Sequence, residues 1–162
     1  MDLKLKNKTA FISGSTTGIG YAAVRALVRE GAAAIINGRT ESKVQEAVQK
    51  LQKEFPNENI SGVCADFSKV AQIEKLLEKL PEIDILVNNV GIYSSASFFE
   101  TEDVDWQQQF EVNVMSGVRL SRKILPKMLS NNWGRILFIS SEYLKKFLSR
   151  SIAHFYSFWK GM

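Results

Sequence analysis

The stretch Thr9–Gly20, TAFISGSTTGIG, decides how the rest of the chain is organised. A short apolar run over residues 10–12 is followed by Gly14, Gly18 and Gly20, and a helical pattern begins at Tyr21. The pattern predicts a strand, a tight turn and a helix. Because glycine lacks a Cβ, the backbone of such a turn can approach a pyrophosphate closely, with the N–H groups of the helix start facing it. An ordinary glycine-rich turn would use the same residues, so the rest of the chain must decide between the two.

The composition indicates one globular domain. The chain has 162 residues, of which 45% are hydrophobic and 23% are charged. Most of its net charge of +4 lies in residues 142–162, so the remainder lacks the basic surface expected of a nucleic-acid-binding protein. No apolar run approaches the ~18 residues that a membrane span requires, and we expect a cytoplasmic protein without a membrane span or a metal site. Cys64, the single cysteine, lies in an apolar run and is expected to be buried.

Four further apolar runs, at residues 33–36, 60–65, 83–87 and 136–139, alternate with helical patterns. Such alternation is typical of βαβ units and of a parallel sheet covered on both faces. We therefore predict an α/β fold, a Rossmann-type doubly wound parallel sheet that is incomplete, with about five strands in the order 3-2-1-4-5. This domain spans residues 1–141, and residues 142–162 form an atypical tail. The expected buried faces of the first and last helices are Ile19, Ala23, Ala26 and Leu27, and Val114, Val118, Leu125 and Leu129.

Four motifs, in this order along the chain, resemble the classical short-chain dehydrogenase/reductase family. Residues 13–20, SGSTTGIG, are similar to the family's TGxxxGIG, and residues 88–91, NNVG, are similar to its NNAG. Asn113 matches a helix asparagine of the family, and residues 134–141 match the strand that delivers its catalytic serine. The resemblance covers residues 1–142, and the segment 84–142 looks most like broad-substrate reductases related to 3-oxoacyl-carrier-protein reductases.

The resemblance implies that a nicotinamide cofactor binds beyond the carboxyl ends of the strands. Residues of the glycine turn would hold the cofactor phosphates and let the helix pack closely: Gly14, Thr16, Thr17, Gly18, Ile19 and Gly20. Asn89, Val90 and Gly91 would hold the nicotinamide-side ribose, or would form only a turn. Asp66, with Phe67 beside it, would accept a hydrogen bond from the adenine amino group, and Asp66 is equally suited to cap the next helix.

The end of the second predicted strand indicates which cofactor is bound. Dehydrogenases that use NAD usually place an acidic residue there for the ribose 2′-OH, whereas this chain has Asn37, Gly38 and Arg39. The Arg39 guanidinium suits a 2′-phosphate, so we expect NADP(H), with NAD(H) the less favoured cofactor. The alternative is a solvated surface arginine at a helix start.

The chemistry that the resemblance implies is hydride transfer, with a tyrosine moving the proton. Ser141 would hydrogen-bond the substrate oxygen, and Asn113 would hold a water in a proton relay. Tyr156 and Lys160 have the Tyr-x-x-x-Lys spacing, in which the lysine is needed because the reference pKa of tyrosine is ~10. However, the family's tyrosine would first be sought at His154, and family members continue through further strands and helices that complete the sheet and the substrate pocket.

Three functions remain open on the sequence. The first is an oxidoreductase that transfers hydride between NADP(H) and a small-molecule alcohol or carbonyl. The second is a truncated, catalytically impaired nucleotide-binding fragment of such an enzyme. The third makes the basic, aromatic tail an interfacial segment that touches a membrane or a partner. Family members are homo-oligomers, and we do not extend that expectation to this chain.

Overall fold

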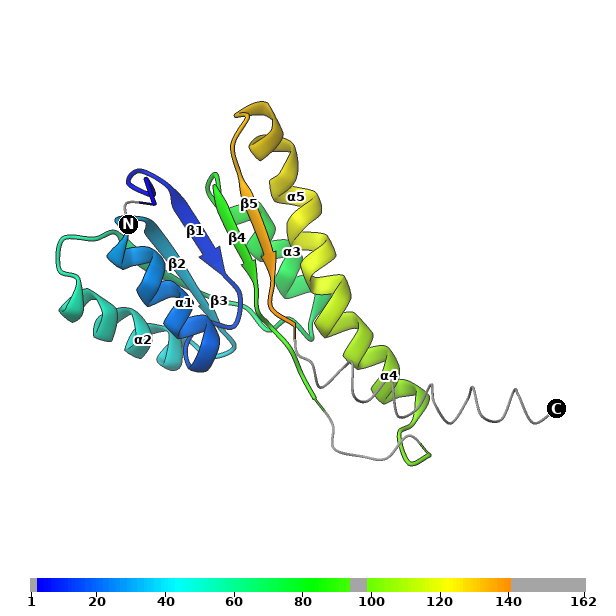
Figure 1. Cartoon of the computed structure of the whole chain (residues 1–162). Coiled ribbons are helices and arrows are strands. Elements are labelled where there is room, and N and C mark those ends of the chain that lie inside the picture. Colours follow the sequence, from blue (N-terminus) through cyan, green and yellow to red (C-terminus); the bar gives the residue numbers. More distant parts are fainter. Residues whose placement is uncertain (1–2, 94–98, 141–162) are drawn as a thin grey trace, which may run out of the picture.

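The computed structural model describes residues 3–93 and 99–140 (Figure 1). Its strands are β1 (Thr9–Ile12), β2 (Ala33–Gly38), β3 (Ile60–Cys64), β4 (Ile85–Asn88) and β5 (Arg135–Phe138). Its helices are α1 (Gly18–Arg29), α2 (Glu41–Glu54), α3 (Val70–Lys79), α4 (Asp103–Phe110) and α5 (Ser116–Ser130), and a π-helical turn (Glu111–Met115) joins the last two. The strands pair in parallel in the order β3-β2-β1-β4-β5, which confirms the predicted fold and strand order.

Side chains of the central strand alternate between the two faces of the sheet. Ile12 packs with Val24 of α1 and with α2, whereas Phe11 packs on the opposite face with Ile73 of α3 and Leu120 of α5. Both β1 side chains are fully buried because helices cover both faces there. A central strand enclosed in this way gives the glycine turn at its end a rigid support.

The predicted buried face of α1 is wrong for Ile19 and Ala26, which are exposed, although Leu27 packs against the core. The helix buries Gly20, Val24 and Val28, while Ile19 is 66% exposed. A Cβ on Gly20 would lie only 2.6 Å from the carbonyl oxygen of Gly14. The close approach of this glycine to the turn therefore sets the rotation of the helix, and a hydropathy pattern does not report that approach.

The predicted buried face of α5 is also wrong. The helix buries Gly117, Leu120, Ile124 and Met128 and leaves Leu125 and Leu129 exposed. A Cβ on Gly117 would lie 2.5 Å from the ring of Phe138, so the missing side chain lets the helix come close to β5. Apolar residues follow both sides of this helix, and the sheet contacts the side that carries the glycine.

Cys64 is exposed, so the prediction of a buried thiol is wrong. β3 is one of the two edge strands of the sheet among the described residues, and Cys64 pairs there with Gly38 of β2. An apolar run on an outer strand is not enclosed as it would be in the middle of a sheet. Within residues 3–93 and 99–140, no helix is long and apolar enough to cross a membrane, and no group of three or more His, Cys, Asp or Glu residues is arranged to hold a metal ion.

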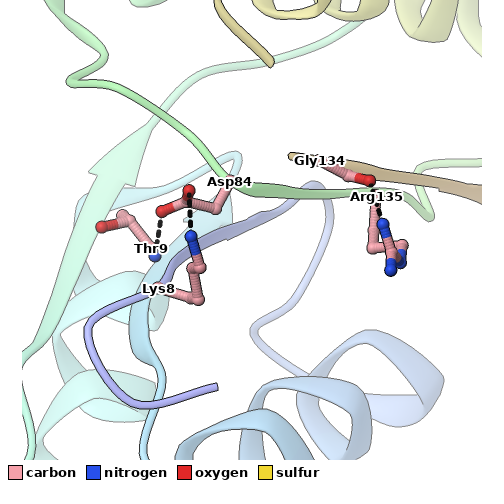
Figure 2. Close-up of polar contacts among 5 residues, drawn as sticks. All are labelled: Lys8, Thr9, Asp84, Gly134 and Arg135. Carbon is pink, nitrogen blue, oxygen red and sulfur yellow. Dashed lines mark hydrogen bonds and ion pairs between the residues drawn. The ribbon is translucent and has the colours of Figure 1, made fainter. Parts of the chain in front are cut away.

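Asp84 joins three strands at their amino ends (Figure 2). Its Oδ2 accepts the N–H of Thr9 at 2.9 Å, and its Oδ1 lies 3.3 Å from Lys8 Nζ. Its main-chain oxygen accepts the N–H of Arg135 at 3.0 Å. These bonds hold β1, β4 and β5 in register, so their carboxyl ends meet at the opposite edge of the sheet.

Candidate cofactor-binding site

The glycine turn lies at the carboxyl end of β1. Gly14 and Gly18 have φ angles of 61° and 60°, which residues with a side chain rarely adopt. The N-cap of α1, Thr17, makes no side-chain capping hydrogen bond, and residues 17–19 are exposed. The first N–H groups of α1 therefore have no side-chain acceptor at their helix end. A helix start of this kind is suited to bind an anion.

Ser13 connects the turn to the end of β4. Its hydroxyl accepts hydrogen bonds from the N–H groups of Asn89 at 2.9 Å and Val90 at 3.1 Å. The Asn89 Nδ2 in return donates to the main-chain oxygens of Ser13 at 3.0 Å and Gly14 at 2.9 Å. Val90 fills the space beside the turn, because a Cβ on Gly14 would lie 2.9 Å from Val90 Cγ2. The structure thus brings two predicted cofactor-binding segments together as one unit.

Asn37, at the end of β2, is a structural residue of the site that the sequence did not identify as one. It is only 1% exposed. Its Oδ1 accepts the N–H of Gly14 at 3.0 Å, and its Nδ2 donates to the carbonyl oxygens of Val63 at 3.3 Å and Ala65 at 3.2 Å. Asn37 therefore holds the turn against β2 and β3. A polar residue at the end of an otherwise apolar strand was the available signal.

Arg39 is the first exposed residue after β2. The preceding Gly38 is buried, and a Cβ there would lie 2.5 Å from Thr16 Cγ2 and 3.0 Å from Val44 Cγ2. The carboxamide of Asn37 is engaged in hydrogen bonds with main-chain groups, and Gly38 is enclosed by neighbouring side chains. Neither position can therefore offer a carboxylate to a ribose unless the turn moves, and the group exposed at this strand end is the guanidinium of Arg39.

Asp66 lies after β3 in a local turn. Its Oδ1 accepts hydrogen bonds from the N–H of Ser68 at 3.0 Å and from the Ser68 hydroxyl at 2.8 Å. Partial burial raises the pKa of Asp66, but the Ser68 hydrogen bonds and the charges of Lys69 and Arg39 outweigh it and hold that pKa below its usual value. The carboxylate is therefore ionised at neutral pH and can accept a further hydrogen bond.

Two expectations for this segment need revision. The N-cap of α3 is Lys69, so the interpretation of Asp66 as the cap is wrong. Phe67 is 2% exposed and packs in the core between the sheet and α3. Its ring is thus not available to stack on an adenine, and a contact with the cofactor would have to use its main chain.

Asn113 lies in the π-helical turn before α5. Its Oδ1 accepts the N–H of Ile92 at 2.7 Å, and its Nδ2 donates to the carbonyl oxygen of Ile92 at 3.0 Å. π-helical turns within helices are frequent at functional sites. Here the carboxamide holds the chain after Gly91 against the helix. With both side-chain atoms engaged, a relay water would need another group of this segment, and the catalytic role of Asn113 stays a prediction.

Three predicted catalytic residues, Ser141, Tyr156 and Lys160, lie outside the described residues, as does His154. β5 nevertheless leads to the site. The N–H of Ile139 donates to the carbonyl oxygen of Asn88 at 2.9 Å, next to Asn89. The chain therefore reaches the carboxyl edge of the sheet two residues before Ser141.

Comparison of the sequence and the structure with known proteins identifies the family of this chain. The family model for short chain dehydrogenases matches residues 8–154. The chain belongs to the short-chain dehydrogenase family. The uncharacterized oxidoreductase YvrD of Bacillus subtilis is 48% identical over 145 residues, which cover 88% of this chain and 54% of YvrD. The 3-oxoacyl-[acyl-carrier-protein] reductase FabG of Aquifex aeolicus is 31% identical over 145 residues. The matched residues cover 87% of this chain and 58% of FabG.

A solved structure of the family supports the same fold. The crystal structure of L-sorbose reductase from Gluconobacter frateurii, complexed with NADPH and L-sorbose, has a TM-score of 0.79 and 32% sequence identity. The match covers 85% of this chain and 54% of the reductase. The chain therefore spans about half the length of the relatives that it matches.

Proposed function

We propose that this member of the short-chain dehydrogenase family binds NADP(H) and transfers hydride between that cofactor and an alcohol or carbonyl substrate. The observation that carries the proposal is the end of β2. Asn37 is buried under the turn, Gly38 is enclosed by Thr16 and Val44, and Arg39 is exposed. A guanidinium can pair bidentately with a 2′-phosphate in charge-assisted hydrogen bonds.

The remaining residues fit the other parts of such a cofactor. The start of α1, from Thr17 to Ile19, would hold the pyrophosphate, and Asp66 would accept from the adenine amino group. Asn89 and Gly91 would lie beside the second ribose. The bound nicotinamide supplies or accepts the hydride. Within this proposal, the chain contributes binding and orientation through residues that the sheet already holds in place.

The proton transfer is assigned to residues beyond β5. Ser141 would donate a hydrogen bond to the substrate oxygen, and the Tyr156 hydroxyl would exchange a proton with it. The ammonium group of Lys160, one helical turn away, would lower the pKa of the tyrosine. These roles come from the family resemblance and from the spacing of Tyr156 and Lys160.

Replacing Arg39 with alanine is expected to lower NADPH affinity by ~10- to 100-fold, which corresponds to ~1.4–2.8 kcal/mol of lost charge-assisted contact. NADH lacks the 2′-phosphate, so its affinity should change by less than ~3-fold. Fluorescence titration of the full chain with both cofactors measures the two constants. Arg29→Ala, which removes an exposed arginine from the far end of α1, is the matched control. Unchanged NADPH binding in the Arg39 variant, or equal affinities of the native chain for both cofactors, would contradict the assignment.

The alternative function is nucleotide binding without turnover. NADPH oxidation with a panel of ketones and 3-oxoacyl thioesters separates the two functions. Turnover that is lost in both Tyr156→Phe and Ser141→Ala establishes the oxidoreductase, whereas cofactor binding with no turnover in the native chain establishes the alternative.

A further inference from the structure

An ion pair spans the π-helical turn that precedes α5. Nη1 of Arg119, in α5, contacts Oε1 of Glu111, the first residue of the turn. The two residues are eight positions apart, and their side chains are partly buried, with exposed fractions of 22% for Arg119 and 31% for Glu111. Partial burial protects an ion pair from screening by salt, so this pair can influence the helix more than a fully exposed one.

The π-helical form of the turn brings the two charges together. In a regular α-helix, residues eight positions apart differ by about 80° in direction, since each residue turns the chain by ~100°. A π-helical turn accommodates one more residue, so Glu111 and Arg119 are spaced like positions i and i+7, which share one face of a helix. If the turn became a regular α-helix, the carboxylate and the guanidinium would point in different directions. The ion pair therefore stabilises the π-helical form relative to the regular one.

Ser116, the first residue of α5, supports the same form with two hydrogen bonds. Its N–H donates to the carbonyl oxygen of Glu111, five residues back, as in a π-helix. Its buried hydroxyl donates to the carbonyl oxygen of Val112 at 2.6 Å. In a regular α-helix that oxygen would accept the N–H of Ser116. The side chain thus replaces the main-chain donor that Val112 lacks in the π-helical turn.

The π-helical turn determines where the Asn113 side chain lies. Asn113 is the central residue of the turn, and its carboxamide binds both the N–H and the carbonyl oxygen of Ile92, at 2.7 and 3.0 Å. α5 is fixed on the sheet by the buried side chains of Leu120 and Ile124. A regular helix would therefore rotate Asn113 relative to the sheet, and the carboxamide would lose its contact with the segment that follows Gly91.

We propose that Glu111 and Arg119 are positioning residues, whose ion pair selects the π-helical turn and thereby fixes Asn113 on Ile92. This effect on the main chain requires no ligand. Its consequence for the reaction rests on the proposed function, in which Gly91 lies beside the nicotinamide-side ribose. There the ion pair determines how precisely this end of the cofactor is held.

Hydrogen exchange of the full chain, followed residue by residue with NMR, tests the effect on Ile92. In the native chain, the Ile92 amide is expected to exchange at least ~10-fold more slowly than unstructured peptide, because its N–H is bound to Asn113 Oδ1. Arg119→Met removes the charge and should remove most of this protection, while amides of β1 stay protected. Arg122→Met, which neutralises an exposed arginine of the same helix, is the matched control and should leave Ile92 unchanged.

A charge swap distinguishes the ion pair from simple packing. The double variant Glu111→Arg, Arg119→Glu retains the attraction and should restore the protection of Ile92. Glu111→Arg alone places two cations side by side and should lose that protection. The proposal is overturned if Ile92 exchanges as unstructured peptide in the native chain, if Arg119→Met leaves its exchange unchanged, if protection falls equally in β1, or if the swap does not restore it.

NADPH titration of the same variants separates the positioning role from the proposed function. A native chain that binds NADPH should lose ~3- to 30-fold in affinity on Arg119→Met and regain it in the charge swap. Unchanged affinity in a variant whose Ile92 amide has lost its protection overturns the role of the pair at the cofactor site. A native chain that binds no NADPH contradicts the proposed function, and the exchange of Ile92 then still decides whether the ion pair positions Asn113.

Discussion

Asn37→Asp is expected to destabilise the fold by ~3 kcal/mol or more at pH 7, although it changes only one side-chain group. The new carboxylate could still accept the N–H of Gly14. Its second oxygen would replace the Nδ2 that now donates to the carbonyl oxygens of Val63 and Ala65, at 3.3 and 3.2 Å. The site is 1% exposed, so water cannot compensate for this loss.

The pH dependence of the stability of the Asn37→Asp variant shows whether the buried, ionised carboxylate causes the loss. A buried carboxyl group without a cation has a folded-state pKa above its unfolded value of ~3.9. The penalty is therefore absent below the unfolded pKa, grows as the pH rises toward the folded-state pKa, and is complete above it. Urea unfolding at pH 4 and pH 7, relative to the native chain, measures it. Asn57→Asp, in an exposed turn, is the control, and an equal loss at both pH values would refute the explanation.

Replacing Gly20 or Gly18 of the turn with alanine is expected to reduce stability and NADPH binding to different extents. At Gly20 a Cβ would lie 2.5 Å from Asn89 Nδ2, 2.6 Å from the Gly14 oxygen and 2.9 Å from Ser15 Cα. Two of these atoms belong to the backbone, so the helix or the turn has to move. We expect a loss of ~3 kcal/mol in stability, at the upper end of what overpacking costs, together with loss of NADPH binding.

At Gly18 the expected loss of stability is smaller. The residue has a φ of 60°, and no atom lies within 4 Å of the position of a Cβ. Gly18→Ala should therefore cost only the ~1–2 kcal/mol of the left-handed conformation. Since Gly18 begins α1 at the proposed phosphate site, NADPH binding should weaken by more than this stability loss accounts for. Urea unfolding and NADPH titration of both variants test the difference, and equal stability losses would show that the packing at Gly20 is not the cause.

Several features of the fold were predictable because they depend on local patterns. Short apolar runs separated by helical patterns predicted a parallel sheet of about five strands, and the order 3-2-1-4-5 was expected from the Rossmann-type fold. The structure confirms both. Gly14 and Gly18 were recognisable as turn residues because few other residues adopt a positive φ. The carboxyl edge of the sheet followed from the strand order, which placed the glycine turn, Arg39 and Asn89 close together.

The errors arose where residues distant in sequence approach one another. The buried faces of α1 and α5 depend on Gly20 and Gly117, at which backbone or ring atoms lie too close for a Cβ. A hydropathy pattern identifies the face of a helix that has the most apolar side chains. It contains no information about close contacts with residues distant in sequence. Cys64 was predicted to be buried because a single apolar run does not reveal whether its strand lies inside the sheet or at its edge.

The amino-acid sequence by itself determined the family, the parallel sheet and the location of a nucleotide site, because strand and turn propensities act over a few residues. Only the tertiary structure decided that Asn37 is an internal support, that the Phe67 ring belongs to the core and that Asn113 binds Ile92. Each of these depends on hydrogen bonds or packing across 20 or more residues of chain, or on how the sheet is covered. Such contacts exist only once the strands have assembled, since the partners of a buried polar group are chosen by the fold.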